Sequence, residues 1–156
     1  MGAAYDVGVS DCFVCQKHRG EIAIPGGIVY EDDLVSSSHI ALPPDGDRVY
    51  LGTLFVEPKR HVPGFGELTP SEAERVGLVA SRLAAALRAT ERAEHVYLFV
   101  LGDHVPHLHV WLAPRYPGTP REFWNLRLSA WPDAPRGGAA EIAALCERVR
   151  AHLRGG

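Results

Sequence analysis

Three histidines stand close together in the segment HVPHLHVWLAPR, which covers residues 104–115. Two of them, His107 and His109, are separated by one residue, and Trp111 follows at the same spacing. In a β-strand, alternate side chains point to the same face, so a strand here would place both imidazoles and the indole side by side. Imidazole suits metal ligation, proton transfer and nucleophilic attack near pH 7. The segment therefore predicts a chemically active strand face.

The other side chains of this segment support that prediction. Leu108, Val110 and Leu112 alternate with the histidines and would form a wholly apolar opposite face. We expect this face to pack beneath helices, because burial of apolar surface drives folding. A lone histidine is more often an ordinary hydrogen-bonded residue, but alternating histidines opposite a clean apolar face favour a functional role.

Cys12 and Cys15 form a Cys-x-x-Cys pair near the beginning of the sequence. Such a pair serves either redox chemistry or metal binding, and a redox pair is expected after a strand, at the N-terminus of a helix. No strand is predicted before Cys12, so we expect a metal site. Tetrahedral zinc then needs two further ligands. His61, at the end of a predicted strand, and His107 would supply them and tie three distant segments together.

Other residues compete for this site or stand apart from it. His18 and His39 are alternative ligands that the residue pattern leaves open. The remaining cysteine, Cys146, lies on the apolar stripe of a predicted helix, and we interpret it as a small buried hydrophobic residue. An odd count of 3 cysteines argues against a disulfide framework.

The composition is that of an ordinary globular protein, with 156 residues of which 46% are hydrophobic and 22% charged. We predict one domain over residues 1–156, with its core in 12–115 and a C-terminal loop and helix in 116–156. A net charge of −3 argues against binding of polymeric nucleic acid or of a membrane surface. No signal peptide or membrane span is evident, so we expect a cytoplasmic protein.

The predicted elements alternate between strands and helices. Residues rich in β-branched and aromatic side chains predict the strands 27–31, 34–42, 49–58, 95–101 and 107–114. One helix is expected to begin at the capping sequence Thr69-Pro70-Ser71-Glu72, and a second to cover about 138–153. Short connections between the early strands imply an antiparallel sheet, which the helices would cover on one face in an α+β fold.

Taken together, these motifs resemble the histidine triad (HIT) family. The resemblance rests on CFVC, IVYEDD, FVEPKRH, ELTPSE and VPHLHVWLAPR, in this order, and covers about residues 12–115. It implies a five-stranded antiparallel sheet with helices on one face, and pairing of two chains as a homodimer. In zinc-containing bacterial members of the family, the metal ligands match Cys12, Cys15, His61 and His107 here.

The resemblance also implies an activity and a nucleophile. Family members cleave nucleotide phosphoesters, phosphoanhydrides or phosphoramidates at the α-phosphorus. The family nucleophile falls on His109, which would form a nucleotidyl-histidine that water or another acceptor then releases. The zinc would be structural, because four protein ligands leave no open position for water.

Several positions depart from the family pattern. Trp111 stands where the family has its third histidine, which helps to hold and protonate the phosphate or leaving-group oxygen, and an indole can only donate one N–H. His104 is a candidate donor in the short loop before the motif. No acidic residue follows YEDD to bind the ribose, so His39 or Ser38 would face the pocket instead. Arg115, directly after the motif, could meet a phosphate.

The sequence thus predicts a zinc-containing HIT-type hydrolase acting on a nucleotide or a nucleotide-like phosphate compound. Two alternatives stay open: a nucleotidyltransferase, and a nucleotide-binding module that lost turnover with Trp111. The base, the leaving group and the pathway are left undetermined.

Overall fold

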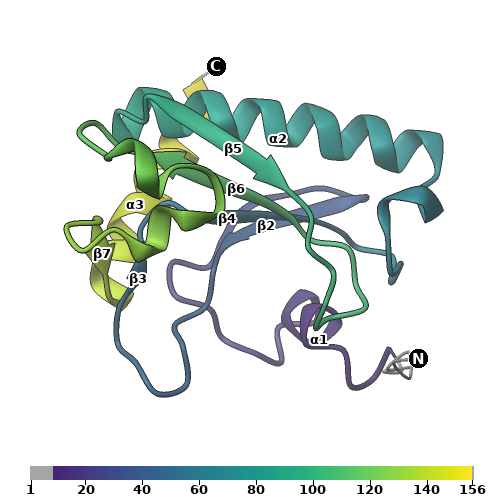
Figure 1. Cartoon of the computed structure of the whole chain (residues 1–156). Coiled ribbons are helices and arrows are strands. Elements are labelled where there is room, and N and C mark those ends of the chain that lie inside the picture. The colour runs from purple at the N-terminus through teal and green to yellow at the C-terminus, as the bar shows by residue number, and fades with distance from the viewer. Residues whose placement is uncertain (1–8, 156) are drawn as a thin grey trace.

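A five-stranded antiparallel sheet forms the centre of the computed structural model, which describes residues 9–155 (Figure 1). The strands lie in the order β1-β2-β4-β6-β5. Their bounds are β1 Ile28–Glu31, β2 Val35–His39, β4 Leu54–Pro58, β5 His95–Phe99 and β6 Val110–Arg115. This confirms the predicted α+β class and the antiparallel sheet. The first residues, on which the expectation of no signal peptide depends, lie outside the described part of the chain.

Two long helices cover one face of this sheet. The helix α2 (Pro70–Glu91) packs against β2, β4, β5 and β6, and α3 (Ala139–Gly155) packs against α2, β1 and β2. The predicted cap of α2 is present: the Thr69 hydroxyl accepts from the Glu72 backbone N–H, and the Glu72 carboxylate accepts from the Thr69 N–H. None of the helices in residues 9–155 is long and apolar enough to cross a membrane.

A third helix, α1 (Phe13–His18), lies on the opposite side of the sheet from α2 (Figure 1). It carries Cys15 and begins after Cys12, which is its N-cap. No sequence pattern predicts this helix, because a helix of 6 residues is too short for an apolar period and this one lacks a side-chain cap. Such a short helix is not stable by itself, so contacts with the rest of the chain must hold it.

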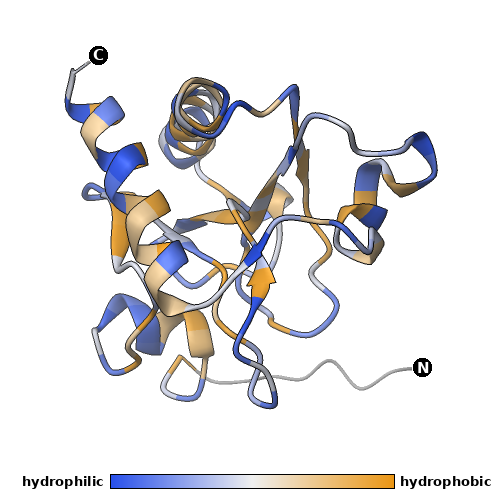
Figure 2. Cartoon of the chain, turned by 90° about the vertical axis from the view of Figure 1, so that its left-hand side faces the viewer, coloured by the Kyte–Doolittle hydropathy of each residue, from blue (hydrophilic) through white to orange (hydrophobic). Residues whose placement is uncertain are grey.

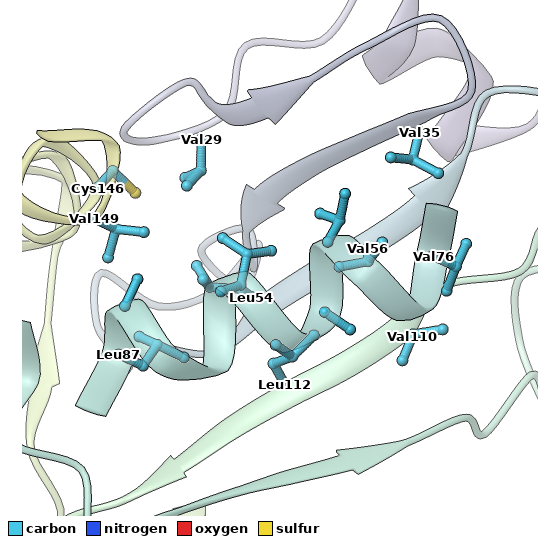
Figure 3. Packing of buried hydrophobic residues seen from close by; sticks show 14 of the residues in the cluster. Val29, Val35, Leu54, Val56, Val76, Leu87, Val110, Leu112, Cys146 and Val149 are labelled. Carbon is cyan, nitrogen blue, oxygen red and sulfur yellow. The ribbon is translucent and has the colours of Figure 1, made fainter. Parts of the chain in front are cut away.

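The hydrophobic core fills the space between the sheet and the two long helices. Figure 3 shows Val56, Leu54 and Leu112 of the sheet directed at side chains of α2, with Cys146 and Val149 of α3 closing one end. Leu108, Val110 and Leu112 all belong to this core, which confirms the predicted apolar face of the histidine segment, and Cys146 is buried as expected. Figure 2 shows the hydrophobic colour concentrated along the central strands. Each fully buried leucine stabilises the fold by about 1.5–3 kcal/mol.

The predicted strand 49–58 is wrong as a single element. It divides into β3 (Val49–Tyr50), which pairs with β7 (Arg136–Gly137), and β4 of the main sheet. Gly52 lies in the turn between them with φ +82°, where a Cβ atom would stand 2.8 Å from the side chains of both Pro114 and Tyr116. The chain turns at Gly52 because only glycine fits both the backbone angle and the space.

The histidine segment also differs from its prediction in extent. The strand β6 begins at Val110, so His107 and His109 lie just before it rather than within it. A backbone hydrogen bond of 2.7 Å from Leu108 N to Val62 O holds the residues just before β6 beside the segment that follows β4. The irregular stretch after Arg115 contains the short 3-10 helices η2 (Arg121–Phe123) and η3 (Asn125–Ala130), and a similar turn, η1 (Phe65–Glu67), precedes α2.

Candidate functional site

Four side chains from three segments meet at the end of the sheet where α1 lies. Cys12 and Cys15 come from the beginning of α1, His61 from the segment after β4, and His107 from the approach to β6, and their ligand atoms all lie within 4.8 Å of one another. The Sγ atom of Cys15 is 3.4 Å from Nδ1 of both His61 and His107, and Sγ of Cys12 is 3.5 Å from Nδ1 of His107. Sulfur and nitrogen ligands on a tetrahedral zinc ion stand about 3.5 Å apart. The cluster therefore fits zinc.

Hydrogen bonding prepares His107 to bind a metal. Its Nε2 lies 2.7 Å from the carbonyl oxygen of Pro58. Since a carbonyl can only accept, Nε2 carries the proton and the lone pair on Nδ1 faces the cysteines. Burial lowers the pKa of His107 to about 4, so the ring is neutral at pH 7. Burial, followed by the neighbouring Cys12, raises the pKa of the Cys15 thiol to about 11, so zinc binding must displace its proton.

The two competing histidines have other partners. His18 Nε2 lies 3.1 Å from the Glu57 carboxylate. His39 is 1% exposed: its Nδ1 donates to the Ile40 carbonyl and its Nε2 accepts from the Gly52 N–H, both at 2.9 Å. The expectation that His39 could face the pocket is wrong, because both ring nitrogens bind backbone groups.

His109 has an equally definite tautomer. Its Nδ1 lies 2.7 Å from the carbonyl oxygen of His107, so Nδ1 is protonated and donates, and Nε2 keeps the free lone pair. The ring packs edge to face against Phe55 with centroids 5.3 Å apart, and its centroid is 5.9 Å from that of Trp111. These contacts fix the orientation of a side chain whose free nitrogen is chemically available.

A hollow of about 270 Å³ opens beside His109. We call it the histidine hollow. It is bordered by α1, by β4, by the loop before β6 and by the start of β6, through Phe13, Val14, Phe55, Glu57, residues 101–105, His109 and Trp111. Its walls are largely apolar, and it therefore has the character of a small-molecule site with few polar groups.

Trp111 forms one wall of this hollow. It packs edge to face on Phe55 with centroids 4.6 Å apart, and stacks on Phe99 at 5.5 Å. Its Nε1 is buried and has no hydrogen-bond partner among the described residues. The indole thus presents an aromatic surface to the hollow, while its N–H is buried.

A buried ionic network, which was not predicted from the sequence, lies under the hollow. The Lys17 ammonium donates to the Glu57 carboxylate at 2.6 Å and to the Ser38 hydroxyl at 3.2 Å, and lies 5.3 Å from the centre of the Phe55 ring. Burial alone would raise the pKa of Glu57, but the hydrogen bond from His18 and the charge of Lys17 hold it below its ordinary value. Ser38 is therefore covered by Lys17 rather than open to the hollow. No local pattern marks this contact, because its members are distant in the sequence.

The remaining predicted site residues fall in different places. His104 is exposed on the loop that borders the histidine hollow. Arg115 lies at the far end of β6, with its guanidinium 3.9 Å from the centre of the Trp124 ring and its other contacts with Tyr97 and Glu94. The structure thus brings His104, His109 and Trp111 together, but it does not bring Arg115 to them.

Comparisons with known proteins agree with the fold described above. A structure from Sulfolobus tokodaii, described as a hypothetical histidine triad nucleotide-binding protein, superposes with a TM-score of 0.71 at 20% identity, over 92% of this chain and 93% of that one. A Zn-bound histidine triad family protein from Mycobacterium smegmatis gives 0.68 at 21% identity, over 95% and 96%. A HIT family protein from Bacillus anthracis gives 0.58 at 29% identity, over 69% and 75%.

The first two likenesses show the fold. No curated protein matches the chain in sequence. The model of the HIT domain matches residues 21–118, which is more than half of the chain. The match includes the histidine segment and ends before η2, η3 and α3. On this evidence the chain belongs to the HIT family.

Proposed function

We propose that this protein is a zinc-containing HIT-type hydrolase that cleaves a nucleotide phosphoramidate, anhydride or ester at the α-phosphorus through a nucleotidyl-His109 intermediate. The observation that carries the proposal is the tautomer of His109, which leaves the Nε2 lone pair free at the wall of the histidine hollow. Family membership supports a nucleotide-like ligand.

The reaction would proceed in two displacements. The lone pair of His109 Nε2 attacks the α-phosphorus, and the bond from phosphorus to the leaving group breaks with its electron pair on the leaving atom. The imidazolium-like charge that develops on His109 is stabilised by the His107 carbonyl, which already accepts from Nδ1. Water then attacks the same phosphorus, the bond from phosphorus to Nε2 breaks with its electron pair returned to the imidazole, and a proton from the water passes to solvent. The mostly apolar walls limit the access of other water molecules.

The Cys12, Cys15, His61 and His107 cluster supports a structural role for zinc. A bound zinc ion with four protein ligands has no open position and would fix the positions of the three segments. Because the His107 carbonyl holds His109, an ordered His107 also orients the nucleophile. In this role the cluster positions the reacting residue without touching the substrate.

The test combines turnover with mass spectrometry of the intact protein. A panel of nucleotide phosphoramidates, anhydrides and esters is incubated with the parent, with His109→Ala and with His152→Ala, whose residue is exposed on α3 away from the hollow. We expect turnover and a nucleotidyl adduct in the parent and in His152→Ala, and neither in His109→Ala. Zinc content and melting temperature should be the same in all three.

Two results would overturn the hydrolase proposal. The first is the absence of any His109-dependent turnover or adduct across the panel, and tight nucleotide binding in that case would favour a binding module. The second is a parent without activity that gains it in Trp111→His, since this would mean that Trp111 blocks a dead site. Release of the nucleotidyl group to an added phosphate in preference to water would indicate a transferase.

Assembly as a homodimer and a cytoplasmic location stay predictions. The strand β5 pairs only with β6 in the described sheet, and Leu98 on it is 50% exposed. An open edge with an exposed leucine supports pairing with a second chain. Light scattering that gives the mass of one chain at high micromolar concentration would contradict the dimer.

A further inference from the structure

A second and larger hollow, of about 400 Å³, adjoins the histidine hollow. Trp111 lines both hollows; His109 lies two residues before it, just ahead of β6, and Ala113 lies two residues after it on β6. Residues 109 and 113 are about 13 Å apart along a strand. A ligand that reacts at His109 can therefore extend past the indole into this second space.

The second hollow combines an aromatic floor with two cationic groups. Tyr50, Phe99 and Trp111 contribute apolar and aromatic surface, and Arg48 and Arg136 are exposed lining residues. No acidic side chain of the described residues lines it. We call it the arginine hollow. The aromatic floor and Arg48 lie within residues 21–118, whereas η3 and β7, which contribute Arg136, follow them in the chain.

Each of the two arginines is held by a hydrogen bond to a carbonyl and keeps further N–H donors. Arg48 donates from Nη2 to the Arg136 carbonyl at 2.6 Å, and Arg136 donates from Nη2 to the Ser129 carbonyl. A guanidinium has five N–H donors, so each retains donors for an anion. No acidic side chain among the described residues lines the hollow beside them, although the charge of Arg48 also acts on Glu141 outside it. An anionic group in the hollow would be attracted to both guanidinium groups.

Neither the Trp111 indole nor the Tyr50 phenol, the two aromatic donors among the described lining residues, is placed to give a proton to a departing group. The Trp111 N–H is buried. The Tyr50 hydroxyl donates to the Pro114 carbonyl at 2.7 Å, and burial raises the pKa of this phenol. An amine must gain a proton to leave phosphorus near pH 7, whereas a phosphate or carboxylate leaves as a stable anion.

We propose that the arginine hollow binds the leaving group of the substrate, and that this group is an organic anion, a phosphate or a carboxylate, attached to an aromatic or apolar body. The assignment rests on the proposed function for the step at His109. In that step the bond from the α-phosphorus to the bridging oxygen breaks, and the oxygen keeps the electron pair. The resulting phosphate or carboxylate is stabilised by Arg48 and Arg136, and its body packs on the aromatic floor. The enzyme thus acts on mixed anhydrides in preference to phosphoramidates.

Three compounds with the same phenyl body test this assignment. Adenosine 5′-phosphate is joined to phenyl phosphate, to benzoate or to aniline, so that the leaving group is a phosphate, a carboxylate or an amine. In the double variant Arg48→Gln/Arg136→Gln we expect kcat/KM to fall at least tenfold on the two anhydrides and less than twofold on the anilide. The charge-preserving variant Arg48→Lys/Arg136→Lys should retain most of the activity, and Arg127→Gln, on η3 outside the hollow, should retain all of it.

Direct measurements of probe binding test the anion site independently of the proposed reaction at His109. Calorimetry with phenyl phosphate and with benzoate should show binding to the parent and equally to His109→Ala, and at least tenfold weaker binding to the double Gln variant. The probe that binds more tightly identifies the chemical source of the anion. If none of the three compounds is turned over but the probes still bind in an arginine-dependent way, the proposed chemistry is refuted and the anion site is supported. The inference would be overturned if the double Gln variant lowered kcat/KM equally on all three substrates. It would also be overturned if the double Gln variant bound phenyl phosphate and benzoate as tightly as the parent.

Discussion

The buried ion pair of Lys17 and Glu57 allows a quantitative test of how α1 is held on the sheet. The two side chains are 2% and 1% exposed, and their charged atoms are 2.6 Å apart. In Lys17→Met the methylene stem is largely preserved, but the carboxylate loses its cation. Glu57 keeps one partner, the His18 ring at 3.1 Å.

The expected cost follows from this burial. Removing one partner of a buried pair costs about 3–5 kcal/mol, because the other charge is left without compensation. The remaining contact with His18 favours the lower part of that range, about 3 kcal/mol. In a chain of this length each kcal/mol lowers the melting temperature by about 2–4 °C, so the melting temperature should fall by about 6–12 °C.

Denaturant unfolding of the zinc-loaded protein measures this loss. The variant Lys17→Met/Glu57→Gln removes both charges and keeps a partner for His18, so we expect it to recover most of the stability that Lys17→Met loses. Arg154→Met, which breaks an exposed pair with Glu147, is the control and should leave the unfolding free energy unchanged. A loss of less than about 1 kcal/mol in Lys17→Met, or a double variant as unstable as the single one, would refute the reasoning.

Three further changes test other parts of the structure. Cys12→Ala should lose most of the zinc by elemental analysis and melt at a lower temperature, whereas full zinc content and unchanged melting would contradict the assigned ligands. Hydrogen bonds, first from Arg60 and then from the backbone at the helix cap, lower the pKa of Glu72 to about 2, so its stabilising contribution is present above about pH 4.5 and is lost as the pH falls through 2. Glu72→Gln should therefore be less stable than the parent at pH 7 by about 1 kcal/mol, a modest value because Arg60 is half-exposed. The difference between the melting temperatures of the two proteins should shrink at pH 3.5. A difference that stays constant with pH would contradict this reasoning. Gly52→Ala should destabilise by more than 1 kcal/mol in denaturant unfolding, and no effect would show that the turn tolerates a Cβ.

The histidine segment shows why part of the site could be predicted from the sequence. Alternation of Leu108, Val110 and Leu112 with polar residues is a local signal, and it correctly placed the apolar side in the core. The Cys12–Cys15 spacing is also local, so a metal site could be expected from it. The choice of His61 and His107 over His18 and His39 needed the family resemblance, since ligands from different segments meet only in the fold.

Other features had no local signal. The strand pattern of 49–58 continues through Gly52, and the turn is required by close approach to Pro114 and Tyr116, which are distant in sequence. Lys17 and Glu57 likewise gave no sign of their contact, because a lysine in a short segment is ordinarily expected to be solvated. The arginine hollow depends on η3 and β7, whose irregular sequence carries no period.

The short helix α1 links the metal cluster to the proposed chemistry. Its N-cap and first turn supply Cys12 and Cys15, the two residues between them, Phe13 and Val14, form part of the wall of the histidine hollow, and Lys17 ties the helix to β4. A helix of this length holds its position only through such contacts. The metal cluster and the ion pair therefore both hold α1, which forms one wall of the histidine hollow, in place. Loss of the ion pair would loosen this wall of the hollow, and loss of the cluster would also disturb His107, which orients His109. A stability change at α1 should therefore appear in substrate affinity as well as in melting temperature, even though these residues take no part in bond breaking.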